Sequence, residues 1–490
     1  MQSKHPNSSD PKNENIVENK ELDIWEALIP VVILMGLLAY NIFFADGIWL
    51  GDYSNQFILL MGAGIAAVVG FFNKSSLQTM ISEVWENLKS VFIPIMILFL
   101  VGALAGTWLV SGIIPAMVYY GLQVLNPVIF LPTCVIIAAI ISIATGSSWT
   151  TSATVGIALI GIGEALGIPL GMVAGAVISG AYFGDKMSPL SDTTNLAPAM
   201  AGTDLFTHIK YMAITTVPTI VLTLIIFSII SLNIETTGST DVSGLLATID
   251  TTFNITPYLF IVPLVVVILI VLKTKPLIAL GTGVVVAAIF AFIFQPEILG
   301  KLSSSSFSSI TNAIFTDVQI NTDNERLNDL FSSTGMKGML GTIYLCICAM
   351  VFGGVMDGIG ALARITKSLL KMADTVFGLF ASTVFSCLGL NAIASDQYLA
   401  LVIPGKMFAK AYKDKGLAPE NLSRTLEDSG TVTSVLIPWN TCGLYQSSVL
   451  GVGVGEYYLY AFFNWISPFT TLLFAALNIK IKLLATATKD

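Results

Sequence analysis

The chain has 490 residues, of which 54% are hydrophobic and only 11% are charged. Soluble globular proteins carry about 25% charged residues, so this composition and the mean hydropathy of +0.81 predict lipid as the solvent for most of the surface. The net charge of −8 argues against nucleic acid as a partner.

The N-terminal residues 1–24 form a polar tail that lacks the layout of a cleaved signal peptide, so we expect the tail to lie in the cytoplasm. Apolar windows of about 20 residues then predict a first transmembrane repeat over residues 25–232. Two of its apolar stretches are interrupted by polar runs. The predicted helical stretches of this repeat are 27–45, 56–72, 91–110, 127–167, 169–203 and 209–232.

A polar loop of residues 233–256 is expected outside the cell and connects to a second transmembrane repeat over residues 257–480. The long polar segment 295–337 inside this repeat is also expected outside, and residues 481–490 form a cytoplasmic tail. The predicted helical stretches of the second repeat are 257–272, 276–294, 338–356, 376–411, 430–453 and 457–477.

Basic residues give the orientation, because cytoplasmic loops carry an excess of them. Lys273 and Lys275 place the turn between two spans in the cytoplasm, and Lys74 and Lys89 place the loop before Val91 there as well. Lysines flank both ends of the stretch 376–411, so this stretch is expected to enter the membrane and turn back, with Asp396 at its tip. The first half predicts the mirror arrangement, with a hairpin over 127–167. The predicted fold class is an all-α polytopic membrane protein with two inverted repeats of five spans, each with a re-entrant hairpin and a broken helix, and with both termini in the cytoplasm.

Sequence matches at a single offset support this duplication. The polar segment 188–195 is echoed 246 residues later by the segment 434–441. The same offset pairs Ser111 with Asp357, and it pairs Thr150 with Asp396. Helices that break at matching places in two repeats are typical of secondary transporters with a site at the repeat interface.

The first polar run, residues 146–154, carries six hydroxyl side chains in nine residues. Such hydroxyls can bond to helix carbonyls or join helices. At the tip of a hairpin they could instead replace the hydration shell of Na+, because hard cations prefer oxygen ligands. The candidates for cation binding here are Ser147, Ser148 and Thr150, and Trp149 and Thr151 are candidates for contacting an organic substrate.

The second polar run, residues 184–195, contains a proline that interrupts helical hydrogen bonding and two aspartates at membrane depth. A charge near the bilayer centre costs about 3 kcal/mol or more, so such residues are usually functional. Asp192 is the predicted ligand for a metal cation and, with Asp185, a candidate proton carrier. The hydroxyl and amide side chains around them, predicted as further cation ligands, are Ser188, Ser191, Thr193 and Asn195. The alternative is an interfacial loop in which Lys186 and Asp185 are merely solvated.

The second repeat offers fewer charges. Asp396 is a further candidate proton carrier or the N-cap of the following helix, and both roles can hold together. The candidates for binding an organic substrate in this repeat are Ser395, Gln397, Trp439, Asn440 and Thr441. Trp439 could equally be core packing, and Asp357, Glu427 and Asp428 could be caps or interfacial anchors.

The runs Gly146–Gly156 and Gly180–Asn195 resemble the NhaC family of Na+/H+ antiporters, and the resemblance extends over nearly the whole chain. It implies an ion-transporter fold with inverted repeats and re-entrant hairpins. It also implies coupling to Na+ or H+, with Asp192 and its neighbouring hydroxyls as the cation ligands. Because relatives in this family also exchange malate against lactate, and some are suspected to carry amino acids, the resemblance leaves the substrate open.

We therefore expect a secondary transporter of the cytoplasmic membrane that exchanges Na+ for H+ at a shared intramembrane carboxylate. The alternative is a Na+- or H+-coupled exchanger of small organic acids or amino acids, whose carboxylates would bind at helix N-termini. The two histidines form no cluster, the five cysteines suggest no metal site, and an HExxH motif is lacking, so we expect neither an enzyme nor a cofactor. The expected partners are Na+, H+, the lipid bilayer and a second copy of the chain in a homodimer.

Overall fold

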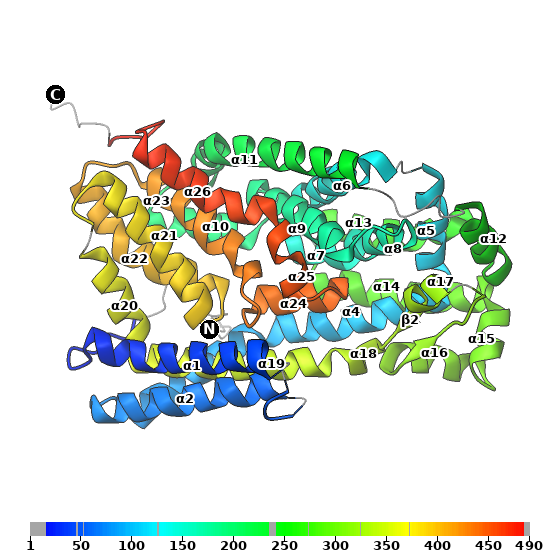
Figure 1. Ribbon diagram of the computed structural model, residues 1–490, viewed down its shortest axis with the longest axis horizontal. Helices are drawn as coiled ribbons and strands as arrows, with labels where there is room; N and C mark the ends of the chain where they lie inside the picture. Colours follow the sequence, from blue (N-terminus) through cyan, green and yellow to red (C-terminus); the bar gives the residue numbers. More distant parts are fainter. Residues whose placement is uncertain are drawn as a thin grey trace, which may run out of the picture.

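A computed structural model describes residues 16–45, 48–51, 53–124, 127–234, 242–272, 274–323, 325–371 and 373–484 (Figure 1). Within these residues the chain is mostly helical, and its one sheet has two short strands. Seven described helices are long and apolar enough to cross a membrane, or up to nine if two bent helix pairs each count as one span. The prediction of an all-α polytopic membrane protein is thereby confirmed.

The first transmembrane region begins at Asp23, which caps helix α1 in a capping box with Glu26. Helix α1 packs against α2, and α2 packs against α19 (Leu340–Gly358) of the second region, along one edge of the molecule in Figure 1. The opening helices are α1 (Ile24–Phe44), α2 (Ser54–Phe72), α3 (Leu77–Ser90), α4 (Phe92–Val110) and α5 (Ile113–Val124).

The two polar runs of this region interrupt helices, as the sequence predicted. The first run follows α6 (Phe130–Thr145) and forms α7 (Ser148–Thr151) and a π-helical turn, Ser152–Gly156, before α8 (Ile157–Ala165). The second run separates α9 (Leu170–Met187) from α10 (Asp192–Ala201), and Ser188 between them is extended. Helix α11 (Leu205–Asn233) completes the region and packs against α6 and α9.

The second region begins with α12 (Val242–Thr252), which lies in the segment that the sequence predicted only as a connecting loop. Helices α13 (Ile261–Val271) and α14 (Pro276–Phe294) follow. The polar segment 295–337 then folds into short elements: α15 (Pro296–Leu302), α16 (Ser306–Phe315), β1 (Val318–Gln319), α17 (Glu325–Leu330), β2 (Ser332–Ser333) and α18 (Gly335–Gly338). Strands β1 and β2 are antiparallel, with Val318 opposite Ser333.

The last third of the chain contains the second pair of interruptions. Helices α21 and α22 pack against each other and are separated at Ser395, which is fully buried and has a φ of +59°. Helix α23 runs into a π-helical turn, Glu427–Thr431, and a 3-10 turn, Ser434–Leu436, before α24. The helices here are α19 (Leu340–Gly358), α20 (Ala361–Leu370), α21 (Val376–Ile393), α22 (Gln397–Asp414), α23 (Pro419–Leu426), α24 (Thr441–Leu450), α25 (Val454–Tyr457) and α26 (Phe462–Ala476).

Large apolar side chains cover the outside of the helical bundle. Phe71 and Phe72 of α2 are 77% and 81% exposed, and Ile229 of α11 is 56% exposed. Exposed apolar side chains on helices of spanning length indicate contact with lipid. The hydroxyl and carboxyl side chains of the four interruptions lie mainly in the interior.

Candidate cation-binding site

A cavity of about 1100 Å³ reaches from helix α3 to the interruptions of both halves. Its wall includes residues of α3, α4 and α22, the polar runs at 145–150 and 190–193, and the ends of α13 and α14. Among the residues that the structure describes, six carboxyl side chains line it, and Lys275 is the only lining Lys or Arg. The six are Glu83, Glu86, Asp185, Asp192, Asp357 and Asp396. This excess of acidic groups favours cations in the cavity.

Glycine at position 146 lets the first polar run approach the broken helix. Gly146 has a φ of +69°, a left-handed conformation that glycine adopts at little cost. A Cβ atom at this position would lie 2.5 Å from Cβ of Leu190 and 3.0 Å from the backbone nitrogen of Ser191. The two predicted site segments are therefore in direct contact at the end of the cavity.

Asp185 is held by the first polar run. Its Oδ2 atom accepts hydrogen bonds from the backbone nitrogen of Ser148 at 3.0 Å and from its hydroxyl at 2.7 Å. Ser148 does not line the cavity, whereas Ser147, Trp149 and Thr150 do. Ser148 thus orients a cavity-lining carboxylate.

Asp192 occupies the first turn of α10, whose N-cap is Ser191. Among the described residues no donor contacts the Asp192 carboxylate, and the side chain is exposed toward the cavity. The adjacent Ser191 and Thr193 also line the cavity, and their hydroxyl oxygens lie 3.2 Å apart. An unpartnered carboxylate beside hydroxyl oxygens at a helix interruption is able to coordinate a hard cation or take up a proton.

Asp396 has one of the two roles that the sequence left open, that of an N-cap, and its role as a proton carrier stays a prediction. Its Oδ1 atom accepts hydrogen bonds from the backbone nitrogens of Tyr398 at 2.7 Å and Leu399 at 3.1 Å, so it caps α22. It also lines the cavity, together with Gln397 and Thr441. The backbone nitrogen of Thr441 donates to the carbonyl of Ser395 at 3.0 Å, which joins the start of α24 to the start of α22.

Several predicted site residues lie outside the cavity wall and bond to the protein itself. Ser188 donates to the carbonyl of Ile143 at 2.8 Å, Asn195 to that of Ser191 at 2.7 Å, and Thr151 to that of Ser147 at 2.9 Å. In the second half, the indole of Trp439 donates to the carbonyl of Ala392 at 2.7 Å, and Asn440 caps α24 by accepting from Cys442 at 3.0 Å. Each of these bonds stabilises the irregular backbone around the cavity.

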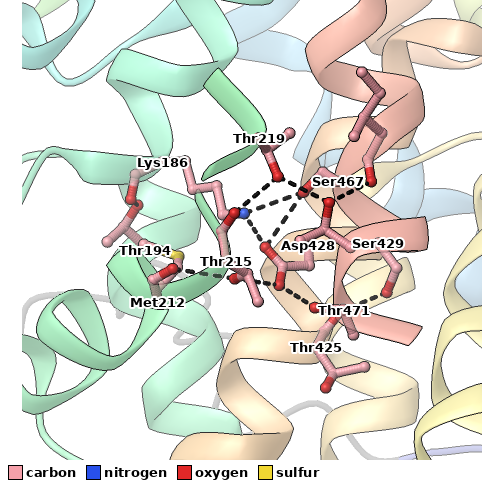
Figure 2. Close-up of polar contacts among 12 residues, drawn as sticks. Lys186, Thr194, Met212, Thr215, Thr219, Thr425, Asp428, Ser429, Ser467 and Thr471 are labelled. Atoms are coloured by element: carbon pink, nitrogen blue, oxygen red, sulfur yellow. Dashed lines mark hydrogen bonds and ion pairs between the residues drawn. The ribbon is translucent and has the colours of Figure 1, made fainter. Parts of the chain in front are cut away.

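The alternative in which Lys186 is solvated at an interface is wrong. Lys186 is fully buried and forms an ion pair with Asp428, which is also fully buried (Figure 2). Three hydroxyl groups donate to the same carboxylate: Thr215 at 2.8 Å, Ser467 at 3.3 Å, and Thr471. The sequence predicted Asp428 only as a cap or an interfacial anchor. Its partner, Lys186, could not be identified there because it lies 242 residues earlier in the chain.

Sequence reasoning also missed the contribution of α3. This helix was predicted only as the loop before the third span, yet its residues Glu83, Glu86 and Asn87 line the cavity. A signal was present in the sequence: Ser76 caps the helix by accepting from Thr79, and Leu77, Met80, Ile81 and Val84 recur at helical spacing.

The chain is similar to known proteins over most of its length. A profile of the Na+/H+ antiporter family matches residues 180–479. The chain is 38% identical to the Na+/H+ antiporter NhaC of Alkalihalophilus pseudofirmus over 85% of this chain and 89% of that protein. It is 36% identical to the Na+/H+ antiporter NhaC of Bacillus subtilis over 79% and 84% of the two chains. It is also 32% identical to the malate-2H+/Na+-lactate antiporter of Bacillus subtilis, over 93% of each chain.

Proposed function

The chain belongs to the Na+/H+ antiporter family, and from this premise we propose that it exchanges Na+ for H+ across the cytoplasmic membrane. The observation that carries the proposal is the Asp192 carboxylate, which has no donor among the described residues and faces an acidic cavity. A carboxylate that binds either Na+ or a proton, but not both, makes each ion leave before the other can bind.

The Na+ ligands in this proposal are oxygen atoms at the junction of the first polar run and the broken helix. Asp192 supplies the charge, and Ser191, Thr193, Ser147 and Thr150 supply hydroxyl oxygens that line the same cavity. Asp185, which Ser148 orients at the same end of the cavity, adds negative charge that favours cation entry.

Alternating access in the proposal follows from inverted repeats, with both termini in the cytoplasm. Its support is the repeated placement of elements: α6 begins at Phe130 and α21 begins 246 residues later at Val376. Lys275 and the α3 residues Glu83 and Glu86 line the cavity and lie in segments expected in the cytoplasm. In this proposal the described conformation is inward-open.

A second candidate function is the coupled exchange of small organic acids, and one observation favours it. The cavity of about 1100 Å³ is much larger than a Na+ ion and falls near the size of small-molecule sites, about 300–1000 Å³. Trp149, Gln397 and Thr441 line it and could contact a carboxylate and its carbon chain. The relative named for malate and lactate exchange shows that the family includes such carriers.

Transport by the purified protein in proteoliposomes tests both functions. An inward Na+ gradient should drive proton efflux without any organic solute, reported by a pH-sensitive dye. Parallel vesicles receive labelled lactate, malate or an amino acid. Proton flux that arises only when an organic solute is present would contradict the antiporter proposal and establish the second candidate.

A further inference from the structure

Two adjacent carboxylates in the π-helical turn Glu427–Thr431 have opposite surroundings. Both Glu427 and Asp428 are fully buried. Asp428 accepts from the Lys186 ammonium and from the hydroxyls of Thr215, Ser467 and Thr471, as Figure 2 shows. A carboxylate with an ammonium partner and three hydroxyl donors is stabilised in its charged form.

Glu427 has none of these donors. Both of its carboxyl oxygens are buried, and neither has a hydrogen-bond partner among the described residues. A charged carboxylate without donors or an ion-pair partner is very costly in a protein interior, so such a group takes up a proton instead. We therefore expect Glu427 to hold a proton beside the charged carboxylate of Asp428, with the Thr431 hydroxyl of the same turn as a nearby polar group.

Helix α9 links this acid to the cation site. The charged groups that act on Glu427 include Lys186, Asp185 and Asp428. Asp185 and Lys186 are consecutive residues of α9, and Asp185 lines the cavity while Lys186 pairs with Asp428. A Na+ ion at the cavity end near Asp185 would add positive charge close to Glu427 and would favour loss of its proton.

The other elements packed on the π-helical turn offer little compensation. Helix α21 contributes the buried Cys387 thiol, and α10 carries Asp192. Arg424 of α23 lies over the rings of Tyr211 and Phe380, 4.6 and 6.0 Å from their centroids. Other titratable groups on these helices include Tyr398, Lys406 and Lys410 of α22 and Glu420 of α23. Tyr412 of α22 is bonded to Thr383, and His208 of α11 is bonded to Ser423 through Nδ1; α26 presents Asn464, Ser467 and Thr471, which carry no charge.

We propose that Glu427 is a second proton-carrying group of the exchange cycle, distinct from the Na+ ligands and protonated when the Na+ site is empty. The inference rests on the proposed Na+/H+ exchange and deepens it. When Na+ binds, the carboxylic O–H bond of Glu427 breaks, its electron pair remains on the carboxylate, and the proton passes to solvent. The positive charges of Na+ and Lys186 then compensate the new carboxylate. A π-helical turn, which is frequent at functional sites, carries this group.

Proton release from the detergent-solubilised full-length protein on addition of Na+ tests the inference. A pH-sensitive dye in weak buffer reports protons released per Na+ bound, with bound Na+ measured by a radioactive tracer. Glu427→Gln keeps the neutral shape of the acid and should release one proton fewer per Na+ than the wild type. Glu427→Asp retains a carboxyl group and should release the wild-type number. Glu456→Gln, at an exposed cap of α25, is the matched control and should also match the wild type.

The outcomes separate the two claims. A wild-type protein that binds Na+ without releasing protons would contradict the proposed exchange itself. Wild-type release that Glu427→Gln leaves unchanged would overturn only the role of Glu427, because a buried acid with a structural role is well mimicked by glutamine. If Glu427→Gln does not fold, infrared difference spectra decide. The wild type should lose a protonated-carboxyl band on Na+ addition, and Glu427→Asp should shift that band; a band that is absent or unshifted would overturn the inference.

Discussion

Asp192 shows how a carboxylate can face a cavity within the helical bundle without a donor among the described residues. Other polar side chains at the interruptions bond to the protein. The Ser148 hydroxyl donates to Asp185, and the Asn440 side chain accepts a hydrogen bond from the backbone at the start of α24. The Asp192 carboxylate alone of the site aspartates Asp185, Asp192 and Asp396 has no donor among the described residues. Its charge is therefore available to a transported cation.

Asp192→Asn should abolish Na+-driven proton flux and leave the protein folded, because no described donor loses its acceptor. Flux is measured in proteoliposomes with a pH-sensitive dye, and folding by size-exclusion chromatography. Asp317→Asn is the control, since the one side-chain partner of Asp317 among the described residues is Lys337, in an exposed ion pair. Near-normal Na+ affinity in Asp192→Asn would move the site elsewhere, with Asp396 as the next candidate.

A comparison of Gly146 with Gly202 separates the backbone strain of adding a side chain from the steric clash. Both have positive φ, +69° and +86°, but a Cβ at Gly146 would clash with Leu190, whereas at Gly202 nothing lies within 4 Å. Gly202→Ala should cost only the left-handed backbone, about 1–2 kcal/mol. Gly146→Ala should lower the thermal stability further and reduce Na+-driven flux, because the first polar run must move away from Ser191. Equal losses of stability in the two variants, with flux intact in both, would show that this contact is dispensable.

At the scale of elements, the sequence predicted the interruptions well because they depend on local chemistry. Pro189 and the polar residues around it break the helix, and the structure ends α9 at Met187 and begins α10 at Asp192. The orientation of side chains at the end of α9 could not be predicted. Asp185 and Lys186 are neighbours in sequence, yet their partners, Ser148 and Asp428, come from different elements and from distant parts of the chain.

The short helices outside the spans were also beyond sequence reasoning based on long apolar windows. Helix α3 has a polar face and was predicted only as a loop. Helix α12 lies in a segment that was predicted as a connecting loop because it is polar. Such helices are stabilised by packing on the spans, and α3 packs against α19. The acidic residues that α3 brings to the cavity therefore become visible only in three dimensions.

The interruption between α21 and α22 leads to a prediction about membrane topology. Single cysteines at Lys371 and Lys413, both exposed, should react with a membrane-impermeant reagent from the same side, the cytoplasm. The reason is that lysines flank both ends of this helix pair, which is then re-entrant. A cysteine at Lys337, in a segment expected outside, should react from the opposite side. Labelling of positions 371 and 413 from different faces would show that the pair crosses and would remove the inverted repeat.

For the whole molecule, the buried ion pair joins the two halves of the chain. Lys186 belongs to the first transmembrane region, and Asp428 to the second, with α11 and α26 supplying the surrounding hydroxyls. Neither end could be paired from the sequence, because 242 residues separate the two side chains and neither segment indicates which distant element packs against it. The pair is thus a tertiary feature that fixes the end of α9 while Asp185 lines the cavity.

A double-mutant comparison tests this role. Lys186→Met leaves the Asp428 charge buried without its ammonium partner, and Asp428→Asn leaves the ammonium without its carboxylate. Each single change should cost about 3–5 kcal/mol, since breaking a buried pair strands an uncompensated charge. The double variant Lys186→Met, Asp428→Asn strands neither charge and should recover most of that loss. Thermal inactivation in detergent compares the wild type, the two single variants and the double variant. Lys337→Met, which breaks an exposed ion pair, is the control and should match the wild type. If the two single losses simply added in the double variant, the two side chains would not depend on each other, and the pair would not hold the halves together.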